Sequence, residues 1–188
     1  MDIVLETERL LLRRWTPADA RTLFAFASDP ETMRFIGDGS AWVDIARAHQ
    51  WITRRVADYE TVGYSPYAVV ERASGRIVGS CGFTYVAALS EIDLGYVFER
   101  ASWGRGYATE AARAVLAYGF DRLGFEEVTA NTVPEHYASR RVLEKIGFEF
   151  RGLRRYEGDE EDSAFYVARR RPAHVPARAP EDSPAHAD

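Results

Sequence analysis

The sequence predicts one domain of the α/β class, of the α+β type, in which helices pack on a central sheet. Runs rich in β-branched and aromatic residues alternate with runs of helical periodicity along most of the chain. Two of the β-rich runs are joined by Ser74-Gly75, a turn signal typical of a hairpin. The chain has 188 residues, which is enough for one complete hydrophobic core and too few for two domains of ordinary size.

The first half of the chain is predicted to contain a strand, two helices and a hairpin. Apolar residues around the arginine pair at 13–14 indicate the first strand. Thr16 is expected to cap the next helix, because Pro17 takes the first helical position and Asp19 supplies an acidic third position. The elements expected here are a strand at 10–15, helices at 17–28 and 42–59, and hairpin strands at 67–71 and 76–83.

The second half is predicted to alternate strands with helices. Gly147 is expected at the C′ position of the last helix, where a left-handed residue commonly ends the helical turn. An acidic turn at 158–162 is expected to join the last two strands. The elements expected here are strands at 91–98, 127–132, 148–153 and 163–169, with helices at 111–118 and 137–146.

Composition excludes several classes of function. The formal net charge is −5, so a general nucleic-acid-binding surface has no electrostatic support. The single cysteine, Cys81, excludes an internal disulfide framework and a cysteine-rich metal site, and its apolar neighbours indicate a buried strand residue rather than a nucleophile. The histidines form no ligand cluster and no Gly-x-Ser-x-Gly elbow occurs, so neither a metal site nor a hydrolase is expected.

The ends of the chain indicate where the protein resides. No apolar run approaches the ~20 residues needed to span a membrane, and the first residues lack the basic and apolar regions of a secretory signal. The reducing cytoplasm is therefore the expected location. From Pro172 onward the composition shifts to Pro, Ala, His and Asp without periodicity, which predicts a disordered C-terminal tail over 172–188.

The most informative segment is a glycine loop between the strand at 91–98 and the helix at 111–118. Its glycines allow a tight turn and leave backbone amides unpaired at the N-terminus of the helix. Those amides and the positive end of the helix dipole favour an anionic ligand such as a pyrophosphate, although an ordinary strand-to-helix turn is the alternative. The loop consists of Trp103, Gly104, Arg105, Gly106, Tyr107, Ala108 and Thr109.

Two familiar nucleotide-binding motifs do not fit this loop. A P-loop needs lysine and then Ser or Thr directly after its last glycine, whereas Tyr107 and Ala108 follow Gly106. A dinucleotide-binding fingerprint read from Gly104 needs glycine or alanine where Thr109 stands. The phosphate ligand is therefore expected to be neither ATP nor NAD.

The glycine loop resembles the acetyl-CoA-binding signature of the GNAT N-acetyltransferases, Gln/Arg-x-x-Gly-x-Gly/Ala, with Gly106 and Ala108 at its last two fixed positions. Segment 133–148 resembles the Pro-Glu-Asn-x-x-Ser and Glu-Lys-x-Gly-Phe motifs of that family. Segment 5–13 resembles the opening strand of the branch that contains the ribosomal-protein alanine N-acetyltransferases. These blocks occur in the family's order, and the resemblance implies a GNAT domain over residues 5–170.

The resemblance implies a mixed, mostly antiparallel central sheet of about seven strands with about four helices. In this family the fourth and fifth strands splay apart, and the pantetheine arm of acetyl-CoA pairs with the open backbone between them. Backbone amides around Val97 and Phe98 are implied to polarise the thioester carbonyl. Asn131 and His136 are also expected near the cofactor. Acetyl-CoA is thus the expected co-substrate, with no metal.

Three acidic or hydroxyl side chains are candidates for the chemistry. Asp93 is the first candidate for the general base, because relatives often carry a glutamate there and strand alternation places it on one face with Gly95 and Val97. A surface carboxylate paired with an arginine is the alternative interpretation, and Glu91 is the substitute base. Ser139 maps onto the serine of the branch's motif, as a donor to the leaving thiolate, with an N-terminal cap or a first-turn serine of its helix as the alternative.

Three positions depart from the family pattern. His136 stands where the family usually has asparagine, although histidine can donate one hydrogen bond and accept another. Trp103 replaces the usual Gln or Arg at the start of the loop. Leu143 occupies the position of a tyrosine that many relatives use as the acid. The first two changes put the strength of cofactor binding in question more than the identity of the cofactor.

The expected function is direct acetyl transfer from acetyl-CoA to a primary amine, with a protein or peptide N-terminal α-amino group as the favoured acceptor. The alternatives are a small-molecule acceptor, such as a polyamine or an aminoglycoside, and a non-catalytic acyl-CoA-binding module. Segments 33–38 and 155–158 resemble the loops that wall the acceptor site in this family. The protein is expected to be a monomer or homodimer that binds neither nucleic acid nor membrane.

Overall fold

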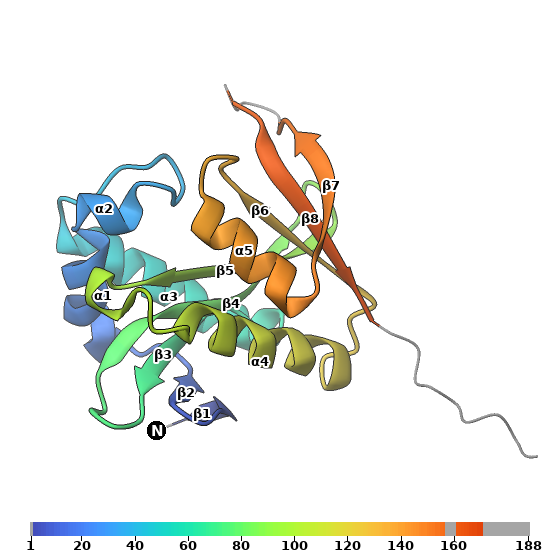
Figure 1. Cartoon of the computed structure of the whole chain (residues 1–188). Coiled ribbons are helices and arrows are strands. Elements are labelled where there is room, and N and C mark those ends of the chain that lie inside the picture. The colour runs from blue at the N-terminus through green and yellow to red at the C-terminus, as the bar shows by residue number, and fades with distance from the viewer. Residues whose placement is uncertain (1, 157–160, 171–188) are drawn as a thin grey trace, which may run out of the picture.

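The structure, a computed structural model, describes residues 2–156 and 161–170. At its centre is an eight-stranded sheet in the order β1-β2-β3-β4-β5-β6-β8-β7 (Figure 1). Neighbouring strands pair antiparallel, apart from β5 and β6, which run parallel. The strands are β1 (Ile3–Glu6), β2 (Leu10–Arg13), β3 (Tyr67–Glu71), β4 (Ile77–Val86), β5 (Glu91–Phe98), β6 (Glu127–Thr132), β7 (Glu149–Arg154) and β8 (Ser163–Arg169).

Helices cover both faces of the sheet and bury two hydrophobic clusters. The first three helices form one cluster, in which Trp15 and Ile52 are buried, and the last two pack over the other, around Phe83 and Val115. Figure 1 shows α4 and α5 in front of the sheet and α3 behind it. The helices are α1 (Ala20–Ala27), α2 (Pro30–Met33), α3 (Ile45–Thr61), α4 (Tyr107–Asp121) and α5 (Tyr137–Ile146).

The sheet opens between β5 and β6. The two strands share a single paired position, Asp93 with Thr129. On either side, the pairing is continuous, because β5 pairs with β4 from Glu91 to Phe98 and β6 pairs with β8 along its whole length. Beyond Asp93 the two strands diverge toward Phe98 and Thr132, which confirms the predicted splay and leaves backbone groups of both strands unpaired within the sheet.

Local sequence signals set the ends of several helices. Thr16 caps a 3-10 turn (Pro17–Asp19) that continues into α1, and the Asp19 carboxylate accepts a hydrogen bond from the Thr16 amide at 2.8 Å. Gly106, with φ of +80°, is the N-cap of α4. Gly147, with φ of +103°, ends α5 in the left-handed conformation, as predicted.

The structure corrects several predicted elements. The N-terminal strand is a hairpin of β1 and β2, so the described part of the chain has eight strands in its sheet rather than seven, and α2 raises the number of its α-helices from four to five. The helix predicted at 42–59 occupies Ile45–Thr61, because the side chain of Asp44 caps it by accepting from the Ala46 amide at 2.9 Å. The helix predicted at 111–118 begins four residues earlier, directly after Gly106. The predicted tail at 172–188 lies outside the described residues.

Two further features are the burial of Cys81 and the length and apolar character of the helices. Cys81 is fully buried in β4, and burial raises the pKa of its thiol, as expected for a core residue. Among residues 2–156 and 161–170, no helix combines the length and the apolar character that a membrane span requires.

Candidate active site

The glycine loop forms one wall of a cavity of about 510 Å³ beside the open part of the sheet. Gly104 and Gly106 both have positive φ, +74° and +80°, which glycine adopts without strain. The loop therefore turns sharply and places the N-terminus of α4 at the cavity. Ten of the twelve predicted cofactor residues line this cavity: Val97, Phe98, Trp103, Gly104, Gly106, Tyr107, Ala108, Thr109, His136 and Ser139.

Arg105 and Asn131, the other two predicted cofactor residues, lie elsewhere. The Arg105 guanidinium pairs with Glu71 at the end of β3, at an N–O distance of 2.7 Å. Asn131 lines a second cavity, on the side of the sheet that α3 covers. The indole of Trp103 donates a hydrogen bond of 2.8 Å to the carbonyl of Phe98 and so ties the start of the loop to the end of β5.

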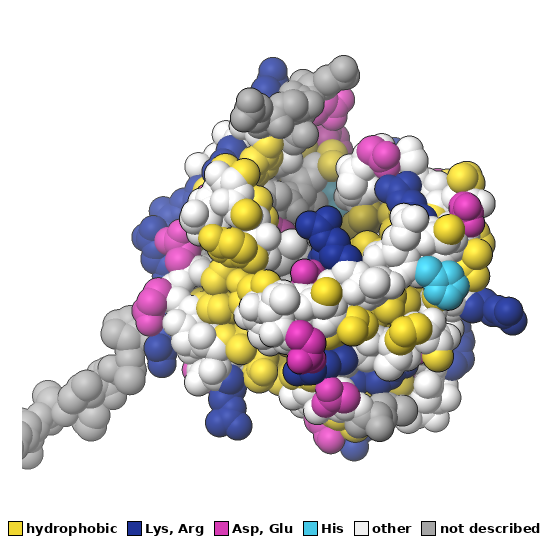
Figure 2. Space-filling view, turned by 180° about the vertical axis from the view of Figure 1, so that it is seen from behind, with side chains coloured by type: hydrophobic (Ala, Val, Ile, Leu, Met, Phe, Trp, Pro, Cys, Tyr) yellow, Lys and Arg dark blue, Asp and Glu magenta, His cyan; other side chains and the backbone are white. Residues whose placement is uncertain are grey.

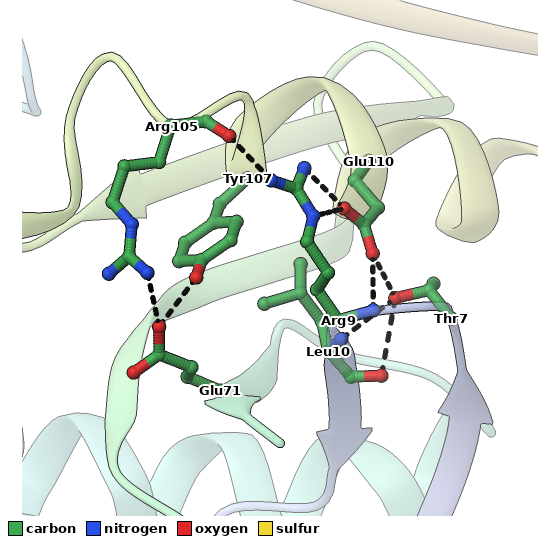
Figure 3. A network of polar contacts seen from close by, with 7 residues as sticks. All are labelled: Thr7, Arg9, Leu10, Glu71, Arg105, Tyr107 and Glu110. Carbon is green, nitrogen blue, oxygen red and sulfur yellow. Dashed lines mark hydrogen bonds and ion pairs between the residues drawn. The ribbon is translucent and has the colours of Figure 1, made fainter. Parts of the chain in front are cut away.

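A polar network holds the glycine loop from below (Figure 3). The Arg9 guanidinium pairs with Glu110 in the first turn of α4 at 2.6 Å and donates to the Arg105 carbonyl at 2.9 Å. The Tyr107 ring lies between the guanidinium groups of Arg9 and Arg105, 4.9 and 4.6 Å from its centroid. Hydrogen bonds from Ser74 and Tyr107 and the charge of Arg105 lower the pKa of Glu71 to about 2, so this anchor stays ionised at neutral pH.

The second cavity has a volume of about 300 Å³ and meets the first at a shared wall. Figure 2 shows the molecule from the side opposite to Figure 1, where the surface is hollowed and basic side chains lie at the edge of the hollow. The two cavities contact six residues in common: Phe35, Ile36, Tyr96, Val97, His136 and Ser139. A molecule in one cavity can therefore meet a molecule in the other beside β5 and α5.

Ser139 and Tyr96 form a pair of hydroxyl groups at this shared wall. The Tyr96 hydroxyl lies 2.9 Å from the Ser139 Oγ and also donates to the Ser139 carbonyl at 3.1 Å. Burial raises the pKa of Tyr96, so the phenol remains protonated at neutral pH. Ser139 is the third residue of α5, whereas the N-cap is His136. Of the two structural interpretations of Ser139, the N-cap is therefore wrong, and a position in the first turn of this helix is confirmed.

Asp93 lies where β5 and β6 meet, next to the second cavity. Its carboxylate accepts a hydrogen bond of 2.9 Å from the Asn131 amide, and the Tyr156 hydroxyl donates to the oxygen of the same amide. Burial, which is opposed by the Asn131 hydrogen bond and reinforced by the negative charge of Glu91, raises the pKa of Asp93 to about 7. The carboxyl group is thus poised to exchange a proton near neutral pH.

Glu91 is engaged differently from Asp93. Its carboxylate pairs with the guanidinium of Arg154 in β7 at 2.8 Å. The alternative interpretation of Asp93 was a carboxylate paired with an arginine. It is Glu91 that forms such an ion pair. Asp93 has an amide as its partner, and the pKa of its carboxyl group is raised.

His136 stacks on Phe35, with ring centroids 4.3 Å apart and an angle of 21° between the planes. Its Nδ1 lies 3.4 Å from the Thr132 hydroxyl, and burial lowers its pKa, which favours the neutral imidazole. The ring therefore forms part of the wall between the cavities. It joins α5 to the 33–38 segment, of which Phe35, Ile36 and Gly37 line the second cavity.

Tyr96 and Arg55 are functional candidates that the sequence interpretation missed. Tyr96 points to the face opposite Asp93, and only the approach of α5 brings Ser139 to it. Arg55 follows the buried Ile52 at helical spacing and is itself buried in α3. A charged residue on the apolar face of a helix was the signal that could have identified it.

Comparison with known proteins identifies similar chains. Residues 9–149 match the family model described as acetyltransferase (GNAT) domain. An uncharacterized protein of Bacillus subtilis, YkkB, is 34% identical over 149 residues, which cover 78% of this chain and 85% of YkkB.

Solved structures show the same fold. An acetyltransferase of the GNAT family from Bacillus anthracis superposes with a TM-score of 0.75 at 26% identity, covering 90% of this chain and 98% of that one. RimL, described as a ribosomal L7/L12 alpha-N-protein acetyltransferase in complex with coenzyme A, gives a TM-score of 0.77 at 15% identity, with coverage of 89% and 98%. At that identity, the likeness concerns the fold alone.

Proposed function

This chain belongs to the GNAT acetyltransferase family, and we propose that it moves an acetyl group from acetyl-CoA directly to the α-amino group of a protein or peptide N-terminus. The observation that carries the proposal is the meeting of two cavities at Tyr96, Val97 and Ser139. One cavity is bounded by the N-terminus of α4 and suits a pyrophosphate. The other reaches toward Asn131 and leaves room for an amine.

The residues fit acetyl-CoA as the donor. A Cβ atom added at Gly106 would meet only the Arg9 side chain, at 3.5 Å, so the loop offers an open approach to the amides of α4. The gap between β5 and β6 suits the pantetheine arm, which carries amide groups that can pair with strand backbone. Acetyl-CoA supplies the activated thioester, and backbone amides around Val97 and Phe98 are proposed to polarise its carbonyl.

The side chains are assigned roles on two sides of the reacting carbon. A carbon–nitrogen bond forms as the carbon–sulfur bond breaks, so the amine loses a proton and the leaving thiolate gains one. Asp93 is proposed to receive the first proton, with Glu91 or a water relay as the remaining alternatives. Ser139, hydrogen-bonded to Tyr96, is proposed to supply the second. Asp93 then releases its proton to solvent and Ser139 regains one from solvent, so the cycle closes without a covalent enzyme intermediate.

The acceptor assignment depends on the basicity of amines. An α-amino group has a pKa of about 7.7–8.0, so roughly a tenth is already neutral at pH 7, whereas a lysine side chain near 10.4 is almost entirely charged. A site with one carboxyl group of pKa about 7 is better matched to the less basic amine. RimL, with the same fold, is described as acting on an α-amino group of a ribosomal protein.

Small polycations are a less suitable class of acceptor. The described residues that line the acceptor cavity include Arg55 but neither aspartate nor glutamate. A polyamine or an aminoglycoside would therefore bring several positive charges to a wall that carries one.

Release of the free thiol of coenzyme A from acetyl-CoA tests the proposal. The acceptors are peptides that begin with Ala or Ser, the same peptides with a blocked N-terminus and an internal lysine, spermidine and an aminoglycoside. We expect the free N-termini to be turned over fastest. Preference for blocked peptides would overturn the α-amino assignment, and preference for small amines would replace it by the alternative acceptor. Binding of acetyl-CoA without turnover of any amine would support a non-catalytic binding module.

A further inference from the structure

We infer that the acceptor carries an anionic group, in the simplest case a carboxylate, which Arg55 binds inside the acceptor cavity. The inference rests on the proposed function, because it names the chemical class of amine that the same site accepts. It is carried by the buried Arg55, which is incompletely paired among the described residues, by the hydroxyl of Ser80, which has no partner among them, and by the pairing of Ser80 with Val97 at the wall shared by the two cavities.

Arg55 is buried in α3 and lines the acceptor cavity, with 8% of its surface exposed. Its Nη2 lies 3.0 Å from Asp58, whereas its Nε has no hydrogen-bond partner within residues 2–156 and 161–170. Asp58 is itself partly exposed and also accepts from Ser65 at 3.4 Å. A guanidinium has five N–H donors in a planar fork that matches a carboxylate, so Arg55 retains donors for a second anion.

Ser80, in β4, lines the same cavity and is also a buried polar residue. It is 4% exposed, and its Oγ makes no hydrogen bond within the described part of the chain. Unpaired buried polar groups are rare, because each forfeits its hydrogen bonds to water when the chain folds. Two of them on one cavity wall, one of them charged, favour a polar ligand that contacts this wall.

The charge of the cavity favours an anion over a second cation. The cavity is lined by Arg55 and by neutral side chains among the described residues, and Asp93 and Glu91 lie outside that lining. Burial lowers the pKa of Arg55, which shows that its positive charge is poorly solvated there. The guanidinium lies over the Trp51 ring at 5.4 Å, which restricts its orientation. A carboxylate at this position would gain a charge-assisted hydrogen bond.

The geometry of β4 and β5 limits how far the anion lies from the amine. Ser80 pairs directly with Val97, and Val97 belongs to the wall shared with the cofactor cavity. Directly opposite residues of antiparallel strands lie about 4.5–5.5 Å apart, with side chains on the same face. An anionic group that contacts both Arg55 and Ser80 would therefore lie within a few bonds of the acceptor nitrogen. An α-amino acid satisfies this condition, as does a peptide whose first or second residue is acidic.

Two pairs of acceptors test the inference on the purified full-length enzyme. Alanine is compared with alaninamide, and the dipeptide amide Ala-Asp-NH2 with Ala-Asn-NH2, so that each pair differs by one charge. The ratio of kcat/KM within a pair does not depend on the fraction of active enzyme. The variants are R55Q, R55K and R54Q, the last being a matched loss of charge at the exposed neighbouring position of α3.

We expect the wild type to prefer at least one carboxylate over its amide by about tenfold or more, and R55Q to reduce that preference to about twofold or less. R55K should retain part of the preference, and R54Q should leave it unchanged. A preference within the amino acid pair identifies a free amino acid as the source, and a preference within the dipeptide pair identifies an acidic peptide N-terminus. Turnover of all four acceptors without preference, or the same preference in R55Q, overturns the inference and leaves the acetyltransferase assignment intact. If no amine of any kind releases thiol, the proposed function itself fails.

Discussion

The raised pKa of Asp93 predicts how the rate of acetyl transfer depends on pH. Its pKa of about 7 means that the carboxylate able to accept a proton is present above this pH and is lost as the pH falls through it. We expect D93N to lower kcat/KM by about a hundredfold above pH 7. Below about pH 6, Asp93 of the wild type is itself protonated, so the kcat/KM values of the wild type and D93N should converge. The measurement is the pH–rate profile of both between about pH 5.5 and 9, with saturating acetyl-CoA.

The matched control for Asp93 is E91Q, which removes the neighbouring carboxylate that is paired with Arg154. Loss of its charge should shift the acidic limb of the profile to lower pH, because Glu91 raises the pKa of Asp93. A D93N profile that keeps the wild-type shape and height would assign the base to Glu91 or to a water relay.

The hydroxyl pair of Ser139 and Tyr96 allows a second prediction at the residue scale. If Ser139 protonates the leaving thiolate, S139A should lower kcat roughly ten- to a hundredfold while the Kd of acetyl-CoA changes little. Y96F removes the partner hydroxyl at 2.9 Å and should have a smaller effect. Y118F, a tyrosine of α4 outside both cavity linings, is the control. A larger loss in Y96F than in S139A would reassign the proton to the tyrosine.

The glycine loop and α4 act together as one element. G106V adds a branched side chain at φ of +80°, so it strains the turn, and it places carbon atoms beside the Arg9 guanidinium that holds the loop. We expect acetyl-CoA affinity to fall at least about tenfold, equivalent to about 1.4 kcal/mol, by titration calorimetry. G124V introduces the same substitution at φ of +74°, after the C-terminal end of α4 and away from the cavity. Equal affinity of G106V and wild type would exclude the loop from the binding site.

The whole molecule consists of two groups of strands that meet at one paired position. β1 to β5 form one continuous ladder and β6 to β8 another, with Asp93 and Thr129 between them. A ligand held between β5 and β6 would bridge the two groups in the folded state only. Acetyl-CoA at 100 times its Kd should then stabilise the protein by about 2.7 kcal/mol. For a chain of this length, that corresponds to a rise in Tm of roughly 5–10 °C.

Thermal unfolding with and without acetyl-CoA measures this stabilisation. G106V should show a reduced shift at the same ligand concentration, whereas G124V should show the wild-type shift from its own baseline. A Tm that does not move with ligand would contradict binding in the gap. Since binding and not turnover is read, the result is independent of the acceptor.

Prediction from the sequence succeeded where a signal is local. The strand at Glu91–Phe98, the helix at Tyr137–Ile146 and its end at Gly147 follow from side-chain alternation, helical spacing and one left-handed glycine. The β1–β2 hairpin was missed because each strand has only four residues, too few for alternation to show. The extra turn at the start of α4 was missed because Gly106 was taken as part of a loop rather than as its N-cap.

The amino-acid sequence by itself determined the family, the order of elements and the glycine loop, because each depends on residues that are adjacent or separated by one helical turn. Only the tertiary structure decided which other side chains those residues contact. Asp93 acquires its raised pKa from burial at the junction of β5 and β6 and from the negative charge of Glu91, and Ser139 meets Tyr96 across 43 positions. Arg55 joins the acceptor cavity because α3 packs behind β4 and β5. Burial and pairing arise from contacts distant in sequence, and periodicity carries no information about them.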